Sequence, residues 1–389
     1  MQQGLATVIA VLLLSIISLA DQNIRVRLFH KDKVTVEGQI QIVGSDLQRG
    51  QKVNFFLKNG EPTWRLESWF EKKPIESNKF PVTVQGTTLE SSFKRLPPFL
   101  KIWPTFVDGK FKRFDVVGTF ELEEYLAGVL GAEMPLSWPI EALKAQVIAS
   151  RTYALKQMEK RKLDNFDVDS TVKDQVYQYD SYIPPEKRKN LTEALAQTKG
   201  IILSNAKGEL VETFYHSDCG GKTDDSYQVW KFGKVGGGAV DQSCAVRLKS
   251  AWEHSVSLKD FLKKLKTELG EMSGNLLTIV TSGSSPGGRI AIVRLLFDNN
   301  NNYLISSTRL RELMGFSDVK STRFEILVSE DKVTFKGRGF GHGVGMCQWG
   351  SKYLAEAGKS YKQILIHYFQ GTQVSAMNGP AEAVSTAGL

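Results

Sequence analysis

The chain has 389 residues, of which 41% are hydrophobic and 24% charged, and its formal net charge is +8. This length suits two or three domains, and the hydrophobic fraction is high enough to bury a core, which excludes a generally disordered chain. The positive charge favours a polyanionic partner, such as nucleic acid, an anionic membrane surface or an acidic cell-wall polymer. Three cysteines are too few for a disulfide scaffold, and their odd number leaves at least one thiol outside any internal pair.

The N-terminal segment predicts export. Residues 5–20 form an uninterrupted apolar run that is followed at once by polar residues. The run is short for a membrane-spanning helix, which needs about 20 apolar residues, and Ser18 and Ala20 supply small residues where signal peptidase reads. We predict a signal peptide over residues 1–20, with an uncleaved anchor as the alternative and the only expected membrane contact. Export argues against nucleic acid as the partner and places the protein in the periplasm, in the cell wall or on the extracellular face of the membrane.

The hydrophobic periods predict an α+β fold, with a mixed β-rich core and a few helices. Strand-like alternation dominates residues 21–115, for example at 24–28 and 34–36. We therefore divide the chain after the signal segment into a β-rich N-terminal region over 21–115, a catalytic core over 116–372 and a flexible tail over 373–389.

Within the core, helical and strand-like segments are interspersed without a regular βαβ alternation. The S-x-x-Q pattern at 360–363 is a capping box that predicts a helix start. Helical periods are expected at 120–135, 137–162, 258–269 and 350–371, and strands at 200–215 and 276–297.

Glu133 is the most informative residue of the first helical segment. It lies four residues after Val129 and seven after Leu126, so it falls on the apolar stripe of the helix. Pro135 disfavours helix at the residue before it, so the helix should end near Glu133. Burial and the negative end of the helix dipole both disfavour ionisation, which raises the pKa of the carboxyl group and suits a general acid. A glutamate that forms a salt bridge inside a turn is the alternative interpretation.

The long helix that follows carries two basic residues on nearly the same side. Arg151 interrupts the apolar stripe, seven residues after Lys144. A buried arginine needs an anionic partner. Two interpretations stay open: an internal ion pair with Glu133 or Glu124, or the cationic wall of a groove for an acidic substrate, with Tyr153 as a sugar platform.

The segment around Cys219 also has two interpretations. His216 and Cys219 have the H-x-x-C spacing of metal ligands, and Cys244 with His254 would complete a zinc site. A disulfide between Cys219 and Cys244 is the simpler account in an exported protein, and we predict that disulfide. A thiol nucleophile is disfavoured because the sequence places no acidic third member beside it. We therefore expect no cofactor, with zinc as the alternative.

The segment 337–350 is rich in glycine, which permits close backbone approach and positive φ angles. It lacks the Lys-Ser/Thr of a phosphate loop and the βαβ context of a dinucleotide loop. His342 has two interpretations, as a donor or proton shuttle in a cleft or as a hydrogen-bonded histidine in a tight turn. Cys347 is predicted to be a small packed thiol.

Taken together, three blocks resemble the stage II sporulation protein D family (SpoIID/LytB type). The first block includes E-M-P at 133–135 and S-R-T-Y-A at 150–154, and the second includes Y-H-S-D-C-G-G-K-T at 215–223. The third is G-R-G-F-G-H-G-V-G-M-C-Q-W-G at 337–350. The resemblance covers roughly residues 23–372 and implies a SpoIID-like core.

The resemblance implies a lytic transglycosylase that cleaves peptidoglycan glycan strands, preferably denuded strands whose stem peptides amidases have removed. The catalytic acid/base of the family is the glutamate of the E-M-P block, here Glu133. It would protonate the oxygen that leaves C1 of MurNAc and then take the proton of the C6 hydroxyl, which closes on C1 to give a 1,6-anhydro end. The residues expected to position substrate are Lys144, Arg151, Tyr153, His216, Ser217, His342 and Gln348.

A non-enzymatic role is the main alternative. The chain would then bind peptidoglycan and activate an N-acetylmuramoyl-L-alanine amidase, as the resemblance to the LytB branch implies. Glu133 is present in both cases, so the sequence does not separate them. A zinc hydrolase centred on His216 and Cys219 is a third possibility.

Overall fold

The computed structural model describes residues 23–43, 48–68, 73–92, 94–179, 183–230 and 237–377. The signal peptide predicted at 1–20 lies outside the described residues, as do residues 378–389. Among the described residues, no helix combines the length and the apolar character needed to cross a membrane. The fold is a strand-rich α+β fold with few helices, which confirms the predicted class.

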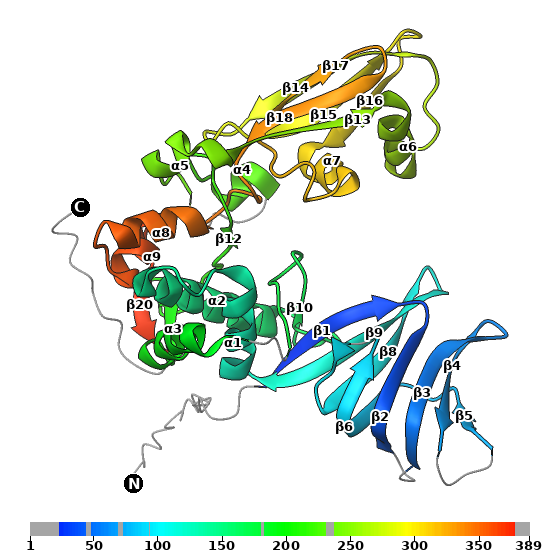
Figure 1. The fold of residues 1–389 in the computed structure, drawn as a ribbon. Helices are drawn as coiled ribbons and strands as arrows, with labels where there is room; N and C mark the ends of the chain where they lie inside the picture. Colours follow the sequence, from blue (N-terminus) through cyan, green and yellow to red (C-terminus); the bar gives the residue numbers. More distant parts are fainter. Residues whose placement is uncertain are drawn as a thin grey trace, which may run out of the picture.

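The N-terminal part of the described chain forms a curved ten-stranded sheet (Figure 1). The strand order is β10-β1-β9-β8-β6-β2-β3-β4-β5, with β7 paired to β6. Only β10 runs parallel to its neighbour, β1. The strands are β1 (Asn23–Lys31), β2 (Val34–Val43), β3 (Gln48–Lys58), β4 (Glu61–Glu67), β5 (Ile75–Ser77), β6 (Val82–Ser91), β7 (Lys94–Arg95), β8 (Phe99–Val107), β9 (Lys110–Glu121) and β10 (Val168–Asp169).

The alternation that predicted these strands also explains which face of the sheet is buried. In β2 and β3 buried residues alternate with more exposed ones on either side of a register shift between Glu37 and Ile40. One face therefore carries the core, including Val34, Val36, Val53 and Phe55. The sheet extends past the predicted boundary at residue 115, because β9 continues to Glu121 and leads directly into the first helix.

A helical layer follows the sheet. Its central helix, α2, contacts each of the other four helices of the layer, and Ala145, Ala149 and Ala154 are fully buried along it. Small side chains on several sides let neighbouring helices approach closely. The helices are α1 (Leu122–Glu133), α2 (Ile140–Lys160), α3 (Pro185–Gln197), α8 (Gln348–Glu356) and α9 (Tyr361–Tyr368).

Two short strand pairs connect distant parts of this layer. β12 (Tyr215–His216) runs parallel to β19 (Met346–Cys347), which brings the second and third sequence blocks together. β11 (Ile201–Ser204) pairs antiparallel with β20 (Gln373–Ala376). The segment predicted as a flexible tail therefore begins with an ordered strand, because Val374 is buried in the core around α9.

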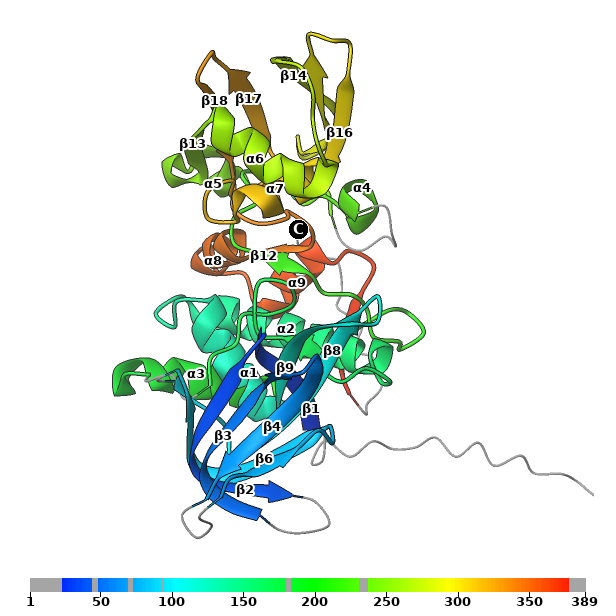
Figure 2. The same ribbon diagram turned by 90° about the vertical axis from the view of Figure 1, so that its right-hand side faces the viewer.

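Between β12 and β19 the chain forms a second lobe, which the sequence did not separate from the core. Two three-stranded sheets, β13-β18-β17 and β14-β15-β16, enclose a core of their own that includes Phe261, Val293 and Phe335. The helical layer lies between this lobe and the large sheet (Figure 2). The elements are α4 (Ser226–Trp230), α5 (Gln242–Val246), a 3₁₀ turn (Leu248–Ser250), β13 (Ala251–Ser257), α6 (Leu258–Leu269), β14 (Leu276–Ser284), β15 (Ile290–Phe297), β16 (Asn302–Ser306), α7 (Ser307–Met314), β17 (Phe324–Val328) and β18 (Lys332–Arg338).

Candidate active site

Glu133 is the last residue of α1, where the sequence pattern predicted the helix to end. Leu126, Val129 and Leu130 of the same helix are buried, and Met134 leaves the helix with extended backbone before Pro135. The carboxyl group of Glu133 therefore lies at the end of the buried face of the helix. Burial raises the pKa of Glu133 above its ordinary value, and three hydrogen bonds partly oppose this shift.

Three donors from distant parts of the chain surround the Glu133 carboxyl group. The backbone N–H of Val176 donates to Oε1 at 2.7 Å, and the Tyr215 hydroxyl lies 3.5 Å from the same oxygen. Gln348 Nε2 donates to Oε2 at 3.3 Å. All three donors are neutral, so the carboxyl group has hydrogen-bond partners without the charge that would hold it ionised.

A buried polar network orients two of these donors. Gln175 Nε2 donates to the Tyr215 hydroxyl at 3.0 Å, which leaves the Tyr215 proton free to point toward Glu133. Gln146 lies beside Gln348, with 3.5 Å between Gln146 Oε1 and Gln348 Nε2. Tyr215, Gln175 and Gln146 were not predicted as site residues, because polar side chains on buried helix and strand faces are also ordinary core residues.

A pocket of about 380 Å³ is lined by Tyr215, whose hydroxyl lies 3.5 Å from Glu133 Oε1, although Glu133 itself does not line the pocket. Aromatic rings form much of the pocket wall: the centroids of Phe214 and Trp230 are 4.9 Å apart, and those of Trp230 and His342 are 5.0 Å apart. Tyr153 also lines the pocket, and its hydroxyl donates to Asp174 at 2.7 Å.

A larger pocket, of about 770 Å³, lies between the large sheet and the helical layer. None of the residues that the sequence predicted for the site line this larger pocket.

The two basic residues of α2 have internal partners. Arg151 is fully buried and makes a two-pronged ion pair with Glu123, with both N···O distances at 2.8 Å, and its Nη1 donates to the Ile201 carbonyl. Lys144 Nζ lies 2.6 Å from Glu141 Oε1. The partner of Arg151 is thus neither Glu133 nor Glu124, and the groove-wall interpretation of Arg151 is wrong because no face of its guanidinium is exposed.

The histidines of the second and third blocks are fixed by the backbone. His216 is buried, with Nδ1 3.1 Å from the Val344 carbonyl. His342 Nε2 lies 2.8 Å from the Tyr215 carbonyl, and its Nδ1 accepts from Val344 N–H at 3.1 Å. Burial lowers the pKa of His342 well below its ordinary value, so the ring is neutral with Nε2–H as the donor. Both ring nitrogens of His342 are thus held by backbone groups, which favours the turn-histidine interpretation, and the residue also lines the pocket.

Gln348 and Ser217, which were also predicted for the site, differ in whether they reach Glu133. Gln348 reaches Glu133 directly, as described above. Ser217 contributes its backbone carbonyl, which accepts a hydrogen bond from Trp349 N–H at 3.1 Å.

The predicted Cys219–Cys244 disulfide is absent, since all three cysteines are free and buried. The zinc set derived from the sequence is also wrong, because His254 lies on β13 with its Nδ1 3.8 Å from Asp318. Cys347 is a buried, packed thiol as predicted, and its Sγ lies 3.7 Å from the Sγ of Cys244. The sequence could not show this proximity, because 103 positions separate the two residues.

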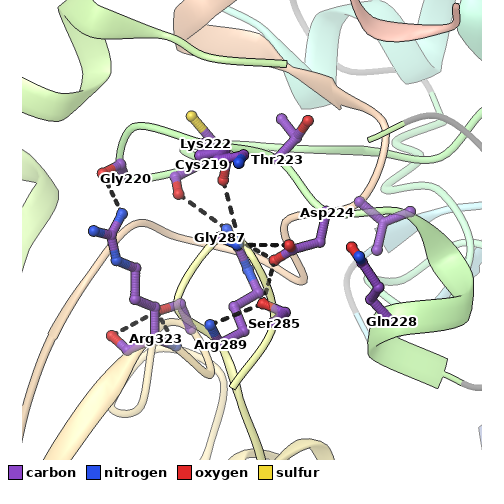
Figure 3. Close-up of polar contacts among 12 residues, drawn as sticks. Cys219, Gly220, Lys222, Thr223, Asp224, Gln228, Ser285, Gly287, Arg289 and Arg323 are labelled. Atoms are coloured by element: carbon purple, nitrogen blue, oxygen red, sulfur yellow. Dashed lines mark hydrogen bonds and ion pairs between the residues drawn. The ribbon is translucent and has the colours of Figure 1, made fainter. Parts of the chain in front are cut away.

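Arg289 packs against the glycine-rich segment at Gly343. The sequence did not indicate this contact. From the turn between β14 and β15, Arg289 reaches Asp224 Oδ2 at 2.8 Å and the Cys219 carbonyl at 2.9 Å (Figure 3). A Cβ atom at Gly343, whose φ is +79°, would stand 1.9 Å from the Arg289 guanidinium. Arg323 adds a second link by donating to the Gly220 carbonyl at 2.6 Å. These contacts tie the second lobe to both the second and the third block.

Two family models match the chain. The model described as "Stage II sporulation protein" matches residues 110–204, which contain Glu133 and α2. A domain of unknown function (DUF8618) matches residues 246–345, which cover the second lobe from the 3₁₀ turn to β18 and most of the glycine-rich segment.

Curated relatives extend this similarity over most of the chain. Stage II sporulation protein D of Bacillus amyloliquefaciens is 31% identical over 335 residues, which covers 81% of this chain and 91% of that protein. Stage II sporulation protein D of Bacillus subtilis (strain 168) is 30% identical over 279 residues, or 67% of this chain and 76% of that protein. The amidase enhancer of the same organism is 30% identical over 295 residues, or 64% of this chain and 40% of that protein. The chain belongs to the stage II sporulation protein D family.

Proposed function

We propose that this protein acts on the cell wall as a lytic transglycosylase, which cleaves glycan strands of peptidoglycan and leaves 1,6-anhydroMurNAc ends. The observation that carries the proposal is the state of Glu133: a partly buried residue whose carboxyl group has a raised pKa and neutral hydrogen-bond donors, one of which, Tyr215, also lines an aromatic-walled pocket. Because its pKa is raised, this carboxyl group holds its proton to higher pH than an ordinary glutamate, as a general acid requires.

In the first step Glu133 donates its proton to the glycosidic oxygen, and the bond from that oxygen to C1 of MurNAc breaks. The oxygen leaves with the donated proton as a hydroxyl of the neighbouring sugar, and C1 gains oxocarbenium character. Glu133 is then a carboxylate, which Val176 N–H and Gln348 Nε2 stabilise through their hydrogen bonds.

In the second step the carboxylate of Glu133 takes the proton of the C6 hydroxyl of the same MurNAc. The C6 oxygen bonds to C1, which closes the 1,6-anhydro ring and returns the proton to Glu133. No water enters, so a second carboxylate to activate water is not required, in contrast to the paired carboxylates of most glycoside hydrolases.

The pocket that Tyr215 shares with the surroundings of Glu133 is suited to hold a sugar ring. Its lining includes the aromatic residues Tyr153, Phe214 and Trp230 and the imidazole residue His342. Aromatic rings can stack on the apolar faces of sugars, and this contact needs no charged group on the ligand. Denuded glycan, which lacks the acidic stem peptides, would contact these aromatic residues directly. The formal net charge of +8 favours binding to the anionic cell wall as a whole.

A second candidate function is the activation of a cell-wall amidase without any chemistry at Glu133. The amidase enhancer of Bacillus subtilis, 30% identical over 295 residues, favours this candidate. A protein of this kind would bind peptidoglycan and raise the activity of an N-acetylmuramoyl-L-alanine amidase. Either function requires export, which we propose on the basis of the apolar run at 5–20.

An order-of-addition experiment separates the two functions. Sacculi are digested with an amidase, the amidase is removed, and the purified protein is then added. A transglycosylase releases soluble glycan from these denuded sacculi without any amidase present. Release only when protein and amidase are present together would refute the enzymatic proposal in favour of amidase activation.

A further inference from the structure

Four buried side chains meet beside α8 and have no part in the mechanism above: Cys219, Asp241, Cys244 and Cys347. One ligand atom of each lies within 4.8 Å of those of the other three. They come from the loop after β12, from the start of α5 and from the junction of β19 with α8. We propose that these four side chains bind one zinc ion.

The distances within the cluster fit tetrahedral zinc. Sγ of Cys244 and Sγ of Cys347 are 3.7 Å apart, and Sγ of Cys219 is 3.2 Å from Asp241 Oδ2. With zinc–sulfur bonds of about 2.3 Å and tetrahedral angles, two sulfur ligands lie about 3.8 Å apart. The side chains therefore need only small shifts to accept the ion, and three thiolates with one carboxylate form a donor set that zinc accepts.

The backbone around the sulfurs is arranged to stabilise thiolates. Gly221 N–H donates to Cys219 Sγ at 3.2 Å, while Cys347 Sγ accepts from Cys219 N–H at 3.2 Å and from Gly350 N–H at 3.3 Å. Cys347 is also the N-cap of α8, where the helix dipole favours negative charge. Neutral thiols would gain little from so many donors.

The carboxylate ligand is held by an outer layer of side chains. The Tyr368 hydroxyl lies 2.9 Å from both oxygens of Asp241, and His367 Nε2 lies 3.5 Å from Oδ1. The side chain of Asp241 is only 4% exposed. Metal ligands are commonly oriented by such partners, and four protein ligands in a closed site indicate a structural ion, since a catalytic zinc keeps an open position.

The ion would hold together parts of the chain that the active site needs in register. Cys347 immediately precedes Gln348, whose Nε2 reaches Glu133. Cys219 lies in the second block, three residues after His216. Zinc binding itself does not depend on the proposed transglycosylase activity, so the two proposals can fail separately.

The test measures metal content directly. The full chain is purified without chelator, reconstituted with zinc and desalted. Its bound zinc is then measured by inductively coupled plasma mass spectrometry. We expect about one zinc per chain for the wild type, as for a closed four-ligand site. The variant His254→Ala is the matched control, because His254 lies outside the cluster, and it should keep its zinc.

Two kinds of variant link the metal to these residues. Cys347→Ala and Asp241→Ala should lose the metal, and Tyr368→Phe, which keeps all four ligands, should weaken zinc affinity about 10-fold. Replacement of zinc by Co²⁺ should give the visible absorption of tetrahedral thiolate coordination. A zinc-free wild type after reconstitution would overturn the proposal, as would unchanged affinity in both Asp241→Ala and Tyr368→Phe. A disulfide found by intact mass in the purified wild type, with no metal, would also overturn it.

Discussion

Glu133 combines burial, which follows from the local sequence of α1, with hydrogen-bond donors that come from distant parts of the chain. Its place on the buried face of α1 follows from residue spacing within one helix. Its donors come from Val176, Tyr215 and Gln348, up to 215 positions away. The helix therefore explains why the carboxyl group is desolvated, whereas the fold explains why the carboxylate is tolerated once the proton has left.

Glu133→Gln should abolish glycan release, because the amide has no acidic proton to donate. We expect a loss of about 10²–10⁴-fold in rate, the range typical of a general acid/base. The melting temperature should not fall, since a neutral amide replaces a carboxyl group that burial already disfavours as an anion. Glu124→Gln, on the exposed side of the same helix, is the control and should retain wild-type activity.

The raised pKa of Glu133 also predicts a pH dependence of activity. Only the protonated carboxyl group can start the reaction, so kcat/KM should fall as the pH rises through this raised pKa. A wild-type profile whose alkaline limb lies at the ordinary carboxyl pKa of about 4.5 would contradict the assignment.

The raised pKa of Glu133 also predicts how the free energy of unfolding depends on pH. The folded pKa of Glu133 lies above the unfolded value, so its protonated form contributes stability that is complete below about pH 4.5 and is lost as the pH rises through the folded pKa. Urea unfolding at several pH values should therefore show Glu133→Gln gaining stability relative to the wild type as the pH rises. A constant difference between the two proteins would contradict this prediction.

At the scale of elements, the ion pair between Arg151 and Glu123 joins α2 to α1. Arg151→Met should lower the free energy of unfolding by about 3 kcal/mol, because it leaves Glu123 without its partner in a mostly buried place. The double variant Glu123→Gln/Arg151→Met should recover part of this loss. Urea denaturation measures both, and a folded Arg151→Met protein with normal stability but a raised KM would instead favour contact with substrate.

The packing of the glycine-rich segment on Arg289 gives a prediction with a matched control. Gly343 and Gly358 have φ angles of +79° and +80°, but a Cβ would meet Arg289 at Gly343 and open space at Gly358. Gly358→Ala should cost about 1–2 kcal/mol from backbone strain alone. Gly343→Ala should cost more, because Arg289 must also move away from Asp224. Equal losses in thermal or urea unfolding would show that the Arg289 contact contributes nothing.

Elements with local signals were predictable from the sequence. The capping box at Ser360 and Gln363 is present at the start of α9, and the predicted amphipathic helix at 258–269 is α6. The end of α1 near Glu133 was equally local, because it depends on Pro135 and on residue spacing. By contrast, the partner of Arg151 depends on how α1 and α2 cross, and no periodicity within either helix contains that information.

At the scale of the whole molecule, the chain leaves the helical layer after β12, builds the second lobe and returns at β19. This excursion brings Cys347 to Cys219 and Met346 to Tyr215 across large gaps in sequence. The sequence predicted strands at 276–297 but not that they close a separate core. Spacing rules act over about one helical turn or one hairpin, so the cysteine cluster and the Arg289 contact could only be found in three dimensions.

The central claim is that Glu133 cleaves glycan without water: it donates its proton to the glycosidic oxygen and then takes the proton of the C6 hydroxyl. The most direct test is mass spectrometry of the glycan ends released from denuded sacculi, with the wild type compared with Glu133→Gln. The account predicts 1,6-anhydroMurNAc ends from the wild type and none from the variant. Reducing MurNAc ends from the wild type, or anhydro ends that persist in Glu133→Gln, would contradict it.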